Sequence, residues 1–457
     1  MRCLFLLAIL LLTACVSNTP FRAADSQCKG HIAGCGSHYI EGADYDMAFV
    51  EFTERGNEFD PELTSRVLNN IKDKASAGGV AIVVFVHGWK HNSSESDPHL
   101  LAFAKALEEV KEKKVVGDRK LIGLYVGWRG RSLAVPGLEH FTFWDRKATA
   151  EEVGRGGVGK VLLQLEAISK ANDSNFMLTV GHSFGAAILV TALHDVMLER
   201  MLVAESGKPL IPFGDGVILI NPAIEANQGL LLKESSMRLG AGGKKVPSMM
   251  HVISSRADVP THFAFPLGQT VGVSLFWRQN VLDRTYLSLY SASDIQASSY
   301  PKKGYKLREK DLDEETIGNY PLYTTGYMED VREEEIEEPS DGTIAPFALP
   351  GMRLRNPDGG RWLYTSFCAP QHWNDQRLPC TDRDPIDFMS MPKSFINDHN
   401  DVFNGKVKAL LSAIVQQYAW AKIDPRFRNQ ACSESGDVFS FTSCFASYLT
   451  LFSGSEN

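Results

Sequence analysis

The chain has 457 residues, of which 44% are hydrophobic and 22% are charged, and its formal net charge at pH 7 is -8. This is the composition of a globular protein that is long enough for one large domain with insertions or for two domains. An acidic chain lacks the positive charge with which proteins bind nucleic acids or anionic membrane surfaces, so we expect neither as a partner.

The N-terminus has the pattern of a bacterial export signal. A short basic start is followed by an apolar run over residues 4–12, and no later apolar stretch is long enough to cross a bilayer. Leu12-Thr13-Ala14-Cys15 resembles a lipobox, which implies cleavage before Cys15 and acylation of that residue. An ordinary signal peptide with an incidental cysteine is the alternative. We therefore expect a lipid-anchored protein of the bacterial cell envelope, at the outer membrane and facing the periplasm.

The cysteines are compatible with such an oxidising compartment. Beyond Cys15, six cysteines fall into three local pairs: Cys28 with Cys35, Cys368 with Cys380, and Cys432 with Cys444. Local disulfide bonds are the simplest prediction, although six cysteines allow fifteen connectivities and free buried thiols are an alternative. The spacing within each pair is too wide for the usual ligands of a structural zinc site.

Strands and helices are predicted to alternate along the first two thirds of the chain. Helices are expected over 61–75, 100–114 and 150–170 and from the residue after Ser183 to about residue 204. Strands are expected over 47–52, 80–86, 121–126, 175–180, 217–222 and 250–254. This alternation predicts an α/β fold with a mostly parallel central sheet, flanked by helices and joined by right-handed crossovers.

The chain divides into four predicted regions. Residues 1–14 form the signal peptide and 15–45 a tether, 46–425 form the α/β domain, and 426–457 form a tail that bears cysteines. Within the domain, the regular pattern is lost over about residues 266–345, which include an acidic run at 329–338, and we expect an insertion beside the sheet. Residues 361–367 are predicted as the last strand, and 402–419 as the final helix.

Gly181-His182-Ser183-Phe184-Gly185 is the most informative motif. It lies between an apolar strand and an apolar helix, and a serine between two glycines at such a corner can occupy a strained turn with its hydroxyl exposed. Glycines are needed there because a Cβ atom would contact the neighbouring strand and helix. The motif therefore predicts that Ser183 is a nucleophile.

A serine hydroxyl needs a base and an acid that orients the base, and in this type of site the acid precedes the base along the chain. Asp258 follows the strand at 250–254 and is the predicted acid, with Asp215 and Glu225 as alternatives beside the adjacent strand. Asp258 is preferred because the acid in this type of site lies in a loop that follows a later strand.

The base is expected late in the chain. His399 lies in a polar loop just before the final helix and is the predicted base. His262 is only four residues beyond Asp258, too close to approach the serine from another loop, whereas His372 is the more serious rival.

The oxyanion that forms during acyl transfer needs hydrogen-bond donors. The backbone N–H of Phe184, directly after the nucleophile, is one predicted donor. The loop after the buried strand at 80–86 reads His87-Gly88-Trp89, and we expect the N–H of Trp89 to be the second. His87 is expected to bond the loop backbone rather than to take part in the chemistry.

The His-Gly loop, the serine elbow, the later aspartate and the final histidine together resemble the α/β-hydrolase superfamily, in particular uncharacterised bacterial serine hydrolases of that fold. The resemblance covers roughly residues 45–425. It implies an α/β-hydrolase fold and the cleavage of a carboxylic ester or related acyl bond through an acyl-enzyme, on a small-molecule or lipid ester. A catalytically silent scaffold lipoprotein with this fold and an envelope phospholipase are the alternatives.

A glycine-rich run, Gly154-Arg155-Gly156-Gly157-Val158-Gly159-Lys160, fits a dinucleotide fingerprint and most of a phosphate-binding loop. Both motifs must follow a strand, but the preceding residues are helical in pattern, and Val161 stands where a magnesium ligand belongs. We expect neither a nucleotide nor a metal or other cofactor, because metal-binding signatures are also missing from the sequence. Two aromatic stretches, 140–144 and 263–277, either line an acyl pocket or pack under the rim of the sheet.

Overall fold

A computed structural model describes thirteen segments of the chain. They are residues 19–23, 28–29, 35–112, 115–117, 119–131, 143–242, 246–261, 265–266, 283–285, 306–330, 353–355, 361–366 and 384–421. The predicted signal peptide with Cys15 and the predicted tail at 426–457 lie outside these residues, and so do most of the cysteines assigned to local pairs. Cys35 is buried and disulfide-bonded.

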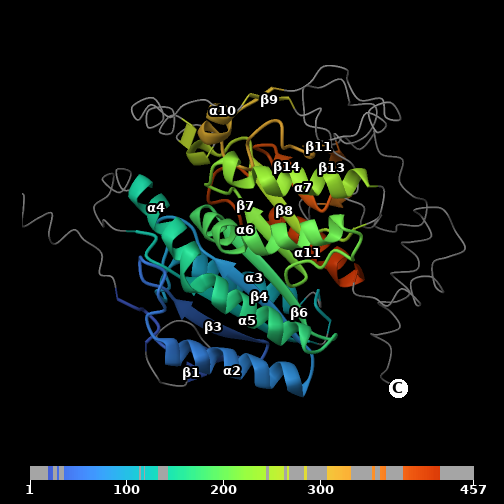
Figure 1. The fold of residues 1–457 in the computed structure, drawn as a ribbon. Coiled ribbons are helices and arrows are strands. Elements are labelled where there is room, and N and C mark those ends of the chain that lie inside the picture. Colours follow the sequence, from blue (N-terminus) through green and yellow to red (C-terminus); the bar gives the residue numbers. More distant parts are fainter. Residues whose placement is uncertain are drawn as a thin grey trace, which may run out of the picture.

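One large sheet of twelve strands runs through the described part of the molecule (Figure 1). Its strands, in spatial order, are β1 (Cys28–Lys29), β2 (Tyr39–Glu41), β3 (Tyr45–Glu51), β5 (Lys120–Gly127), β4 (Val80–Val86), β6 (Phe176–His182), β7 (Gly216–Ile220), β8 (Met250–Ser255), β14 (Ile386–Met391), β11 (Gly326–Asp330), β13 (Arg361–Ser366) and β12 (Arg353–Arg355). From β3 to β11 each neighbouring pair is parallel. The predicted α/β fold with a mostly parallel sheet is therefore confirmed. A separate small sheet pairs β9 (Asp283–Thr285) with β10 (Lys306–Arg308).

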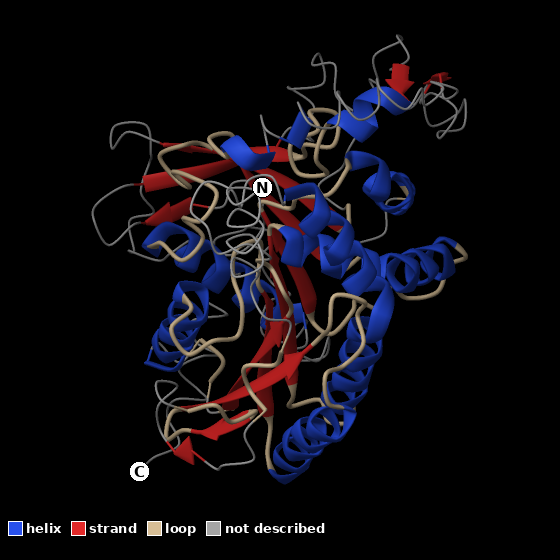
Figure 2. Cartoon of the chain, turned by 90° about the vertical axis from the view of Figure 1, so that its left-hand side faces the viewer, coloured by secondary structure: helices blue, strands red, loops and turns tan. Residues whose placement is uncertain are grey.

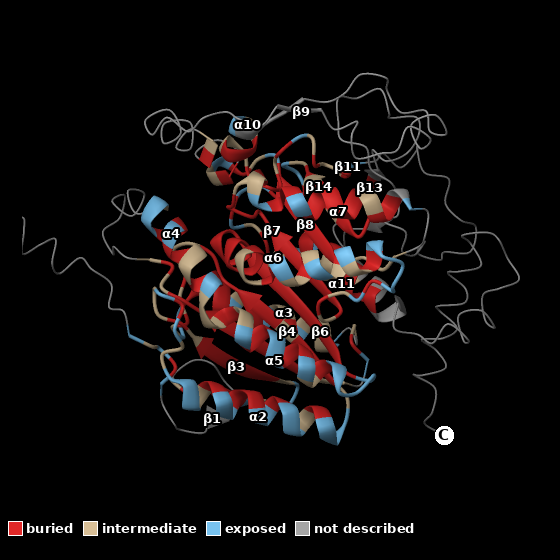
Figure 3. Cartoon of the chain, viewed as in Figure 1, coloured by how far each residue is buried: buried red, intermediate tan, exposed pale blue. Residues whose placement is uncertain are grey.

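Helices cover both faces of the large sheet (Figure 2). The first face carries α2 (Pro61–Ala77), α4 (Phe143–Val153), α5 (Gly159–Lys170), α6 (Phe184–Glu205) and α7 (Leu230–Ala241). The second face carries α3 (Pro98–Glu112) and α11 (Gly405–Ala421). Short helical turns occur at η3 (Ala226–Gly229) and α10 (Glu309–Glu314). The strands are buried between these layers, while the outer faces of the helices are exposed (Figure 3).

The central strand β4 shows how the sequence produces this layering. Side chains alternate between the two faces of a strand, so Ile82, Val84 and Val86 pack with the helices of the first face. Ala81 and Phe85 point the other way and pack against α3 and α11. A strand buried on both faces needs an apolar residue at every position, which explains the continuous apolar run.

The end of the sheet differs from the prediction. The strand predicted over 361–367 forms as β13, which is antiparallel to both of its neighbours, but it is not the last strand because β14 follows it in the chain. That place belongs to β14, which pairs in parallel with β8 over six residues. Within the stretch predicted as an insertion beside the sheet, β11 joins the large sheet between β14 and β13. Residues 286–305 and 331–352 lie outside the described part.

The glycine-rich run at 154–160 lies at a helix junction. The π-helical turn η2 (Gly154–Val158) connects α4 to α5, and Gly156 there has a non-helical backbone with φ -89° and ψ -142°. A Cβ atom on Gly156 would lie 2.5 Å from the carbonyl oxygen of Gly56, and the N–H of Gly157 donates to that same oxygen at 2.7 Å. Close packing of two backbones accounts for the glycines here.

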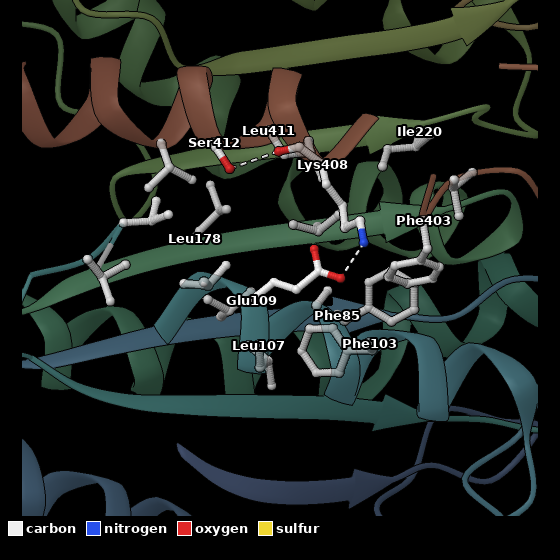
Figure 4. Close-up of a pocket in the computed structure, with 18 of the residues that line it drawn as sticks. Phe85, Phe103, Leu107, Glu109, Leu178, Ile220, Phe403, Lys408, Leu411 and Ser412 are labelled. Atoms are coloured by element: carbon white, nitrogen blue, oxygen red, sulfur yellow. Dashed lines mark hydrogen bonds and ion pairs between the residues drawn. The ribbon is translucent and has the colours of Figure 1, made fainter. Parts of the chain in front are cut away.

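An apolar cavity of about 100 Å³ lies between the sheet, α3 and α11 (Figure 4). Phe85, Leu178 and Phe403 contribute to its wall, and an ion pair between Lys408 and Glu109 lies beside it. Among the residues that the structure describes, no helix is long and apolar enough to cross a bilayer.

Candidate active site

Ser183 lies at the sharp turn between β6 and α6. Its backbone has φ 56° and ψ -121°, a conformation that is rare for residues with a side chain and marks local strain. The flanking glycines make this turn possible, because a Cβ atom on Gly185 would lie 2.0 Å from the carbonyl oxygen of Val86. On Gly181 it would lie 2.8 Å from the Cα atom of Ala186. The turn thus has the geometry expected of a nucleophile elbow.

The structure brings Ser183, His399 and Asp258 into one hydrogen-bonded chain. The Nε2 atom of His399 lies 2.7 Å from the Oγ atom of Ser183, and its Nδ1 atom lies 2.7 Å from the Oδ2 atom of Asp258. The carboxylate can only accept, so Nδ1 carries a proton and the lone pair of Nε2 faces the serine hydroxyl. This is the tautomer that can remove a proton from Ser183.

Asp258 is fully buried in the turn that follows β8. Its Oδ1 atom accepts the N–H of Thr261 at 3.1 Å, so each carboxylate oxygen has a partner. A buried carboxylate that is hydrogen-bonded in this way can hold an imidazole in a fixed orientation.

The alternative acids lie elsewhere. Asp215 lies just before β7, at the opposite end of that strand from Ser183, and accepts the N–H of Met177 at 2.6 Å. Glu225 is paired with Lys147 at 2.7 Å. The rival base His372 lies outside the described residues, and so does His262.

The loop after β4 passes directly beside the nucleophile. A Cβ atom on Gly88 would lie 2.7 Å from the Cβ atom of Ser183, so only glycine allows this approach. The Nδ1 atom of His87 lies 3.0 Å from the carbonyl oxygen of Gly88 and donates to it. In a trans peptide the N–H points away from the C=O, so the N–H of Trp89 is turned to the side opposite the His87 ring.

His87 itself is a structural residue in this loop. Its Nε2 atom accepts the N–H of Trp128 at 3.2 Å, and the indole N–H of Trp128 donates to the carbonyl oxygen of His87 at 2.8 Å. Burial lowers the pKa of His87 to about 4, so the ring is neutral at pH 7. A neutral ring that both donates and accepts fits its two backbone partners.

An aromatic cluster packs around the first turn of α6. The ring of Phe143 lies 4.9 Å from that of Phe184 and 5.2 Å from that of Trp89. Phe265 completes the cluster, 6.5 Å from Phe143 and 5.6 Å from the partly exposed Trp144. Both aromatic stretches singled out in the sequence thus contribute a side chain here, beside the predicted oxyanion donors.

Two further residues contact the base loop and were not predicted. His182 and Asn221 both approach the backbone carbonyl of His399, with nitrogen-to-oxygen distances of 2.8 Å and 3.2 Å. The sequence signal for Asn221 was that a proline follows it at the end of a predicted strand, which marks a turn. Such a signal does not reveal a contact with His399, which is 178 residues away in the sequence.

No cluster of three or more metal-ligating side chains occurs within the segments that the structure describes.

No family model matches the chain. No curated protein matches it either. Among solved structures, one similar chain is the phospholipase PlaB from Legionella pneumophila, with 13% sequence identity and a TM-score of 0.24. The alignment covers 56% of this chain and 48% of that one, so this chain spans about half the length of that structure.

Proposed function

We propose that the protein is a serine hydrolase that cleaves a carboxylic ester or a related acyl bond through an acyl-enzyme. The observation that carries the proposal is the chain of two 2.7 Å contacts from Asp258 through His399 to Ser183 at a strained strand-to-helix turn. A structural role alone does not require a serine in this backbone conformation, with its hydroxyl beside an oriented imidazole.

The reaction follows from the orientation of these groups. His399 takes the hydroxyl proton through Nε2 while the Oγ atom of Ser183 attacks the acyl carbon. The N–H groups of Phe184 and Trp89 then stabilise the negative oxygen of the tetrahedral intermediate. His399 returns the proton to the leaving alcohol as its bond to the acyl carbon breaks. Water then attacks the acyl-enzyme while His399 takes its proton, and His399 returns that proton to the Oγ atom of Ser183 as the acid leaves.

The surroundings of the serine favour an apolar acyl group. The rings of Trp89 and Phe143 pack against each other beside the predicted oxyanion donors, over the buried ring of Phe184, and give this side of the serine an apolar character. We further propose that the enzyme acts at the bacterial cell envelope, where a lipid on Cys15 would hold it near lipid esters. The lipobox-like sequence supports this part of the proposal.

The test is hydrolysis of p-nitrophenyl esters of increasing chain length and of phospholipid vesicles by the mature protein. We expect turnover by wild type, none by Ser183→Ala, and wild-type rates for the matched control Ser76→Ala, whose hydroxyl lies on the exposed side of α2. Preference for vesicles over short esters would identify a phospholipase. A folded wild-type protein that hydrolyses none of these substrates would contradict the proposal and favour a scaffold.

A further inference from the structure

We propose that Asn221 and His182 are positioning residues that hold the loop of His399, and that Asn221 also joins this loop to the turn of Asp258. The inference rests on the proposed function of Ser183, since it concerns how the base of that site is kept in place. It assigns a role to two side chains that act through the backbone carbonyl of His399.

The two side chains meet at one carbonyl group. His182 is the last residue of β6, and Asn221 directly follows the neighbouring strand β7. The Nε2 atom of His182 lies 2.8 Å from the carbonyl oxygen of His399, and the Nδ2 atom of Asn221 lies 3.2 Å from the same oxygen. Both lone pairs of that oxygen are thus used, and the loop is fixed to the ends of two central strands.

The other end of the Asn221 amide reaches the acid side of the site. Its Oδ1 atom accepts the N–H of Ser255 at 2.9 Å, and the backbone N–H of Asn221 donates to the carbonyl oxygen of Ile253 at 2.8 Å. Asn221 is fully buried and has φ 46°, a left-handed conformation that asparagine adopts more readily than most residues. One amide therefore connects the segment before Asp258 to the carbonyl of His399.

A second contact joins the same two segments. The Oγ atom of Ser255, three residues before Asp258, donates to the carbonyl oxygen of Ile396 at 2.7 Å, and Ile396 lies three residues before His399. The acid turn and the base loop are thus fixed to each other at two points. This matters because Asp258 and His399 are 141 residues apart in sequence and share no secondary structure element.

His182 is suited to this role because its ring stays neutral. Burial, followed by the nearby imidazole of His399, lowers the pKa of His182 well below its usual value. A carbonyl oxygen can only accept, so the single ring proton resides on Nε2 and is donated to His399. The ring centroids of the two histidines lie 4.9 Å apart. His399 can therefore take a proton without a second cation beside it.

The expected effect follows from the tolerance of catalytic geometry. A displacement of about 1 Å in a reacting group can lower the rate about 100-fold. Loss of the Asn221 amide removes one of the two donors to the carbonyl of His399 and leaves the N–H of Ser255 without its acceptor. We therefore expect kcat to fall about 10- to 100-fold, while KM changes less than about threefold.

The test compares Asn221→Gly with Asn175→Gly in the mature protein. Glycine accepts a positive φ, so the first change removes the amide contacts without adding backbone strain. Asn175 is an equally buried asparagine at the far end of β6, and its amide also contacts two backbone groups, the N–H of Val80 and the carbonyl of Ile168. We expect both variants to lose thermal stability, but only Asn221→Gly to lose kcat. Equal kcat losses in the two variants, or wild-type kcat in Asn221→Gly, would overturn the proposal.

The role of His182 is tested by rescue. His182→Gln keeps an N–H that can reach the carbonyl of His399, whereas His182→Leu does not. We expect His182→Leu to lower kcat about 10-fold or more and His182→Gln to recover most of it. If the two variants are equally slow, the hydrogen bond is not what matters and the assignment of His182 is wrong.

A measurement that needs no activity separates this inference from the proposed function. In protein labelled with ¹⁵N-histidine, the proton between Nδ1 of His399 and Asp258 should give a far-downfield NMR signal that is lost in Asp258→Ala. We expect this signal in wild type and in Asn175→Gly, but not in Asn221→Gly. If wild type hydrolyses no ester and this pattern is still seen, the proposed function fails while the positioning role stands. If the signal is unchanged in Asn221→Gly, the positioning role fails whatever the activity.

Discussion

The role of the loop that carries the predicted oxyanion donor Trp89 can be tested by adding one methyl group to it, at Gly88. In Gly88→Ala the new Cβ atom would lie 2.7 Å from the Cβ atom of Ser183 and 2.9 Å from the carbonyl oxygen of His182. Both contacts are with backbone or with atoms next to it, so no flexible side chain can move aside. Either the Gly88-Trp89 segment or the nucleophile turn must shift.

The size of the effect follows from these distances. Ordinary contacts of a Cβ atom begin at 3.4 Å, so the 2.7 Å contact requires a shift of about 0.7 Å (3.4 minus 2.7). Because a displacement of about 1 Å can lower a rate about 100-fold, we expect kcat to fall about 10- to 100-fold. Overpacking of this kind also lowers the free energy of unfolding by about 1–3 kcal/mol.

The assay is steady-state hydrolysis of the best p-nitrophenyl ester, together with a thermal unfolding curve. Gly78→Ala is the matched control, because a Cβ atom there would meet nothing within 4 Å and the backbone is extended, with φ -176°. We expect the control to retain wild-type kcat. If Gly88→Ala also keeps kcat within about twofold of wild type, the loop does not supply an oxyanion donor and our reading of it is refuted.

Three further predictions concern the acid, the loop histidine and the helix junction. Asp258→Asn should lower kcat about 10³- to 10⁴-fold, because the amide favours the wrong tautomer of the base, and a loss below about tenfold would contradict this. The pKa of His87 is about 6.5 in the unfolded chain and about 4 in the folded protein, so the unfolded state binds a proton first as the pH falls. Between pH 6.5 and pH 4, protonation of this residue should therefore lower the free energy of unfolding by about 3 kcal/mol. Chemical denaturation across that window should show a smaller loss for His87→Gln, and parallel curves would argue against the buried neutral ring. Gly156→Ala should lower the free energy of unfolding by about 1–3 kcal/mol through its contact with Gly56, with unchanged kcat in the folded protein.

Most of the central sheet could be predicted because its strands are apolar on both faces. The run at 80–86 is typical of a strand buried on both faces, and it forms as β4. β14 was missed because Asp387 and Ser390 interrupt its apolar pattern, in a region rich in polar residues. Asp387 lies 3.2 Å from His251 of the neighbouring strand β8, and such a partner, distant in the sequence, leaves no local signal.

The residues of the site could be predicted from their order along the chain, but the contacts that hold them in place could not. A serine between glycines at a strand-to-helix corner is a local pattern, and the positions of Asp258 and His399 followed from their order after later strands. Asn221 could not be found in the same way. Its role depends on a positive φ and on contacts with two loops that meet only when β7, β8 and β14 pair in the sheet.

The most direct test of the central claim is the site of reaction with a fluorophosphonate probe, which modifies only activated serines. The mature protein would be labelled at neutral pH, digested, and mapped by mass spectrometry, with Ser183→Ala and Ser76→Ala in parallel. We predict one adduct on the peptide that contains Ser183, present in wild type and Ser76→Ala and missing from Ser183→Ala. Labelling that persists in Ser183→Ala, or an adduct that maps to another serine, would contradict the assignment of the nucleophile.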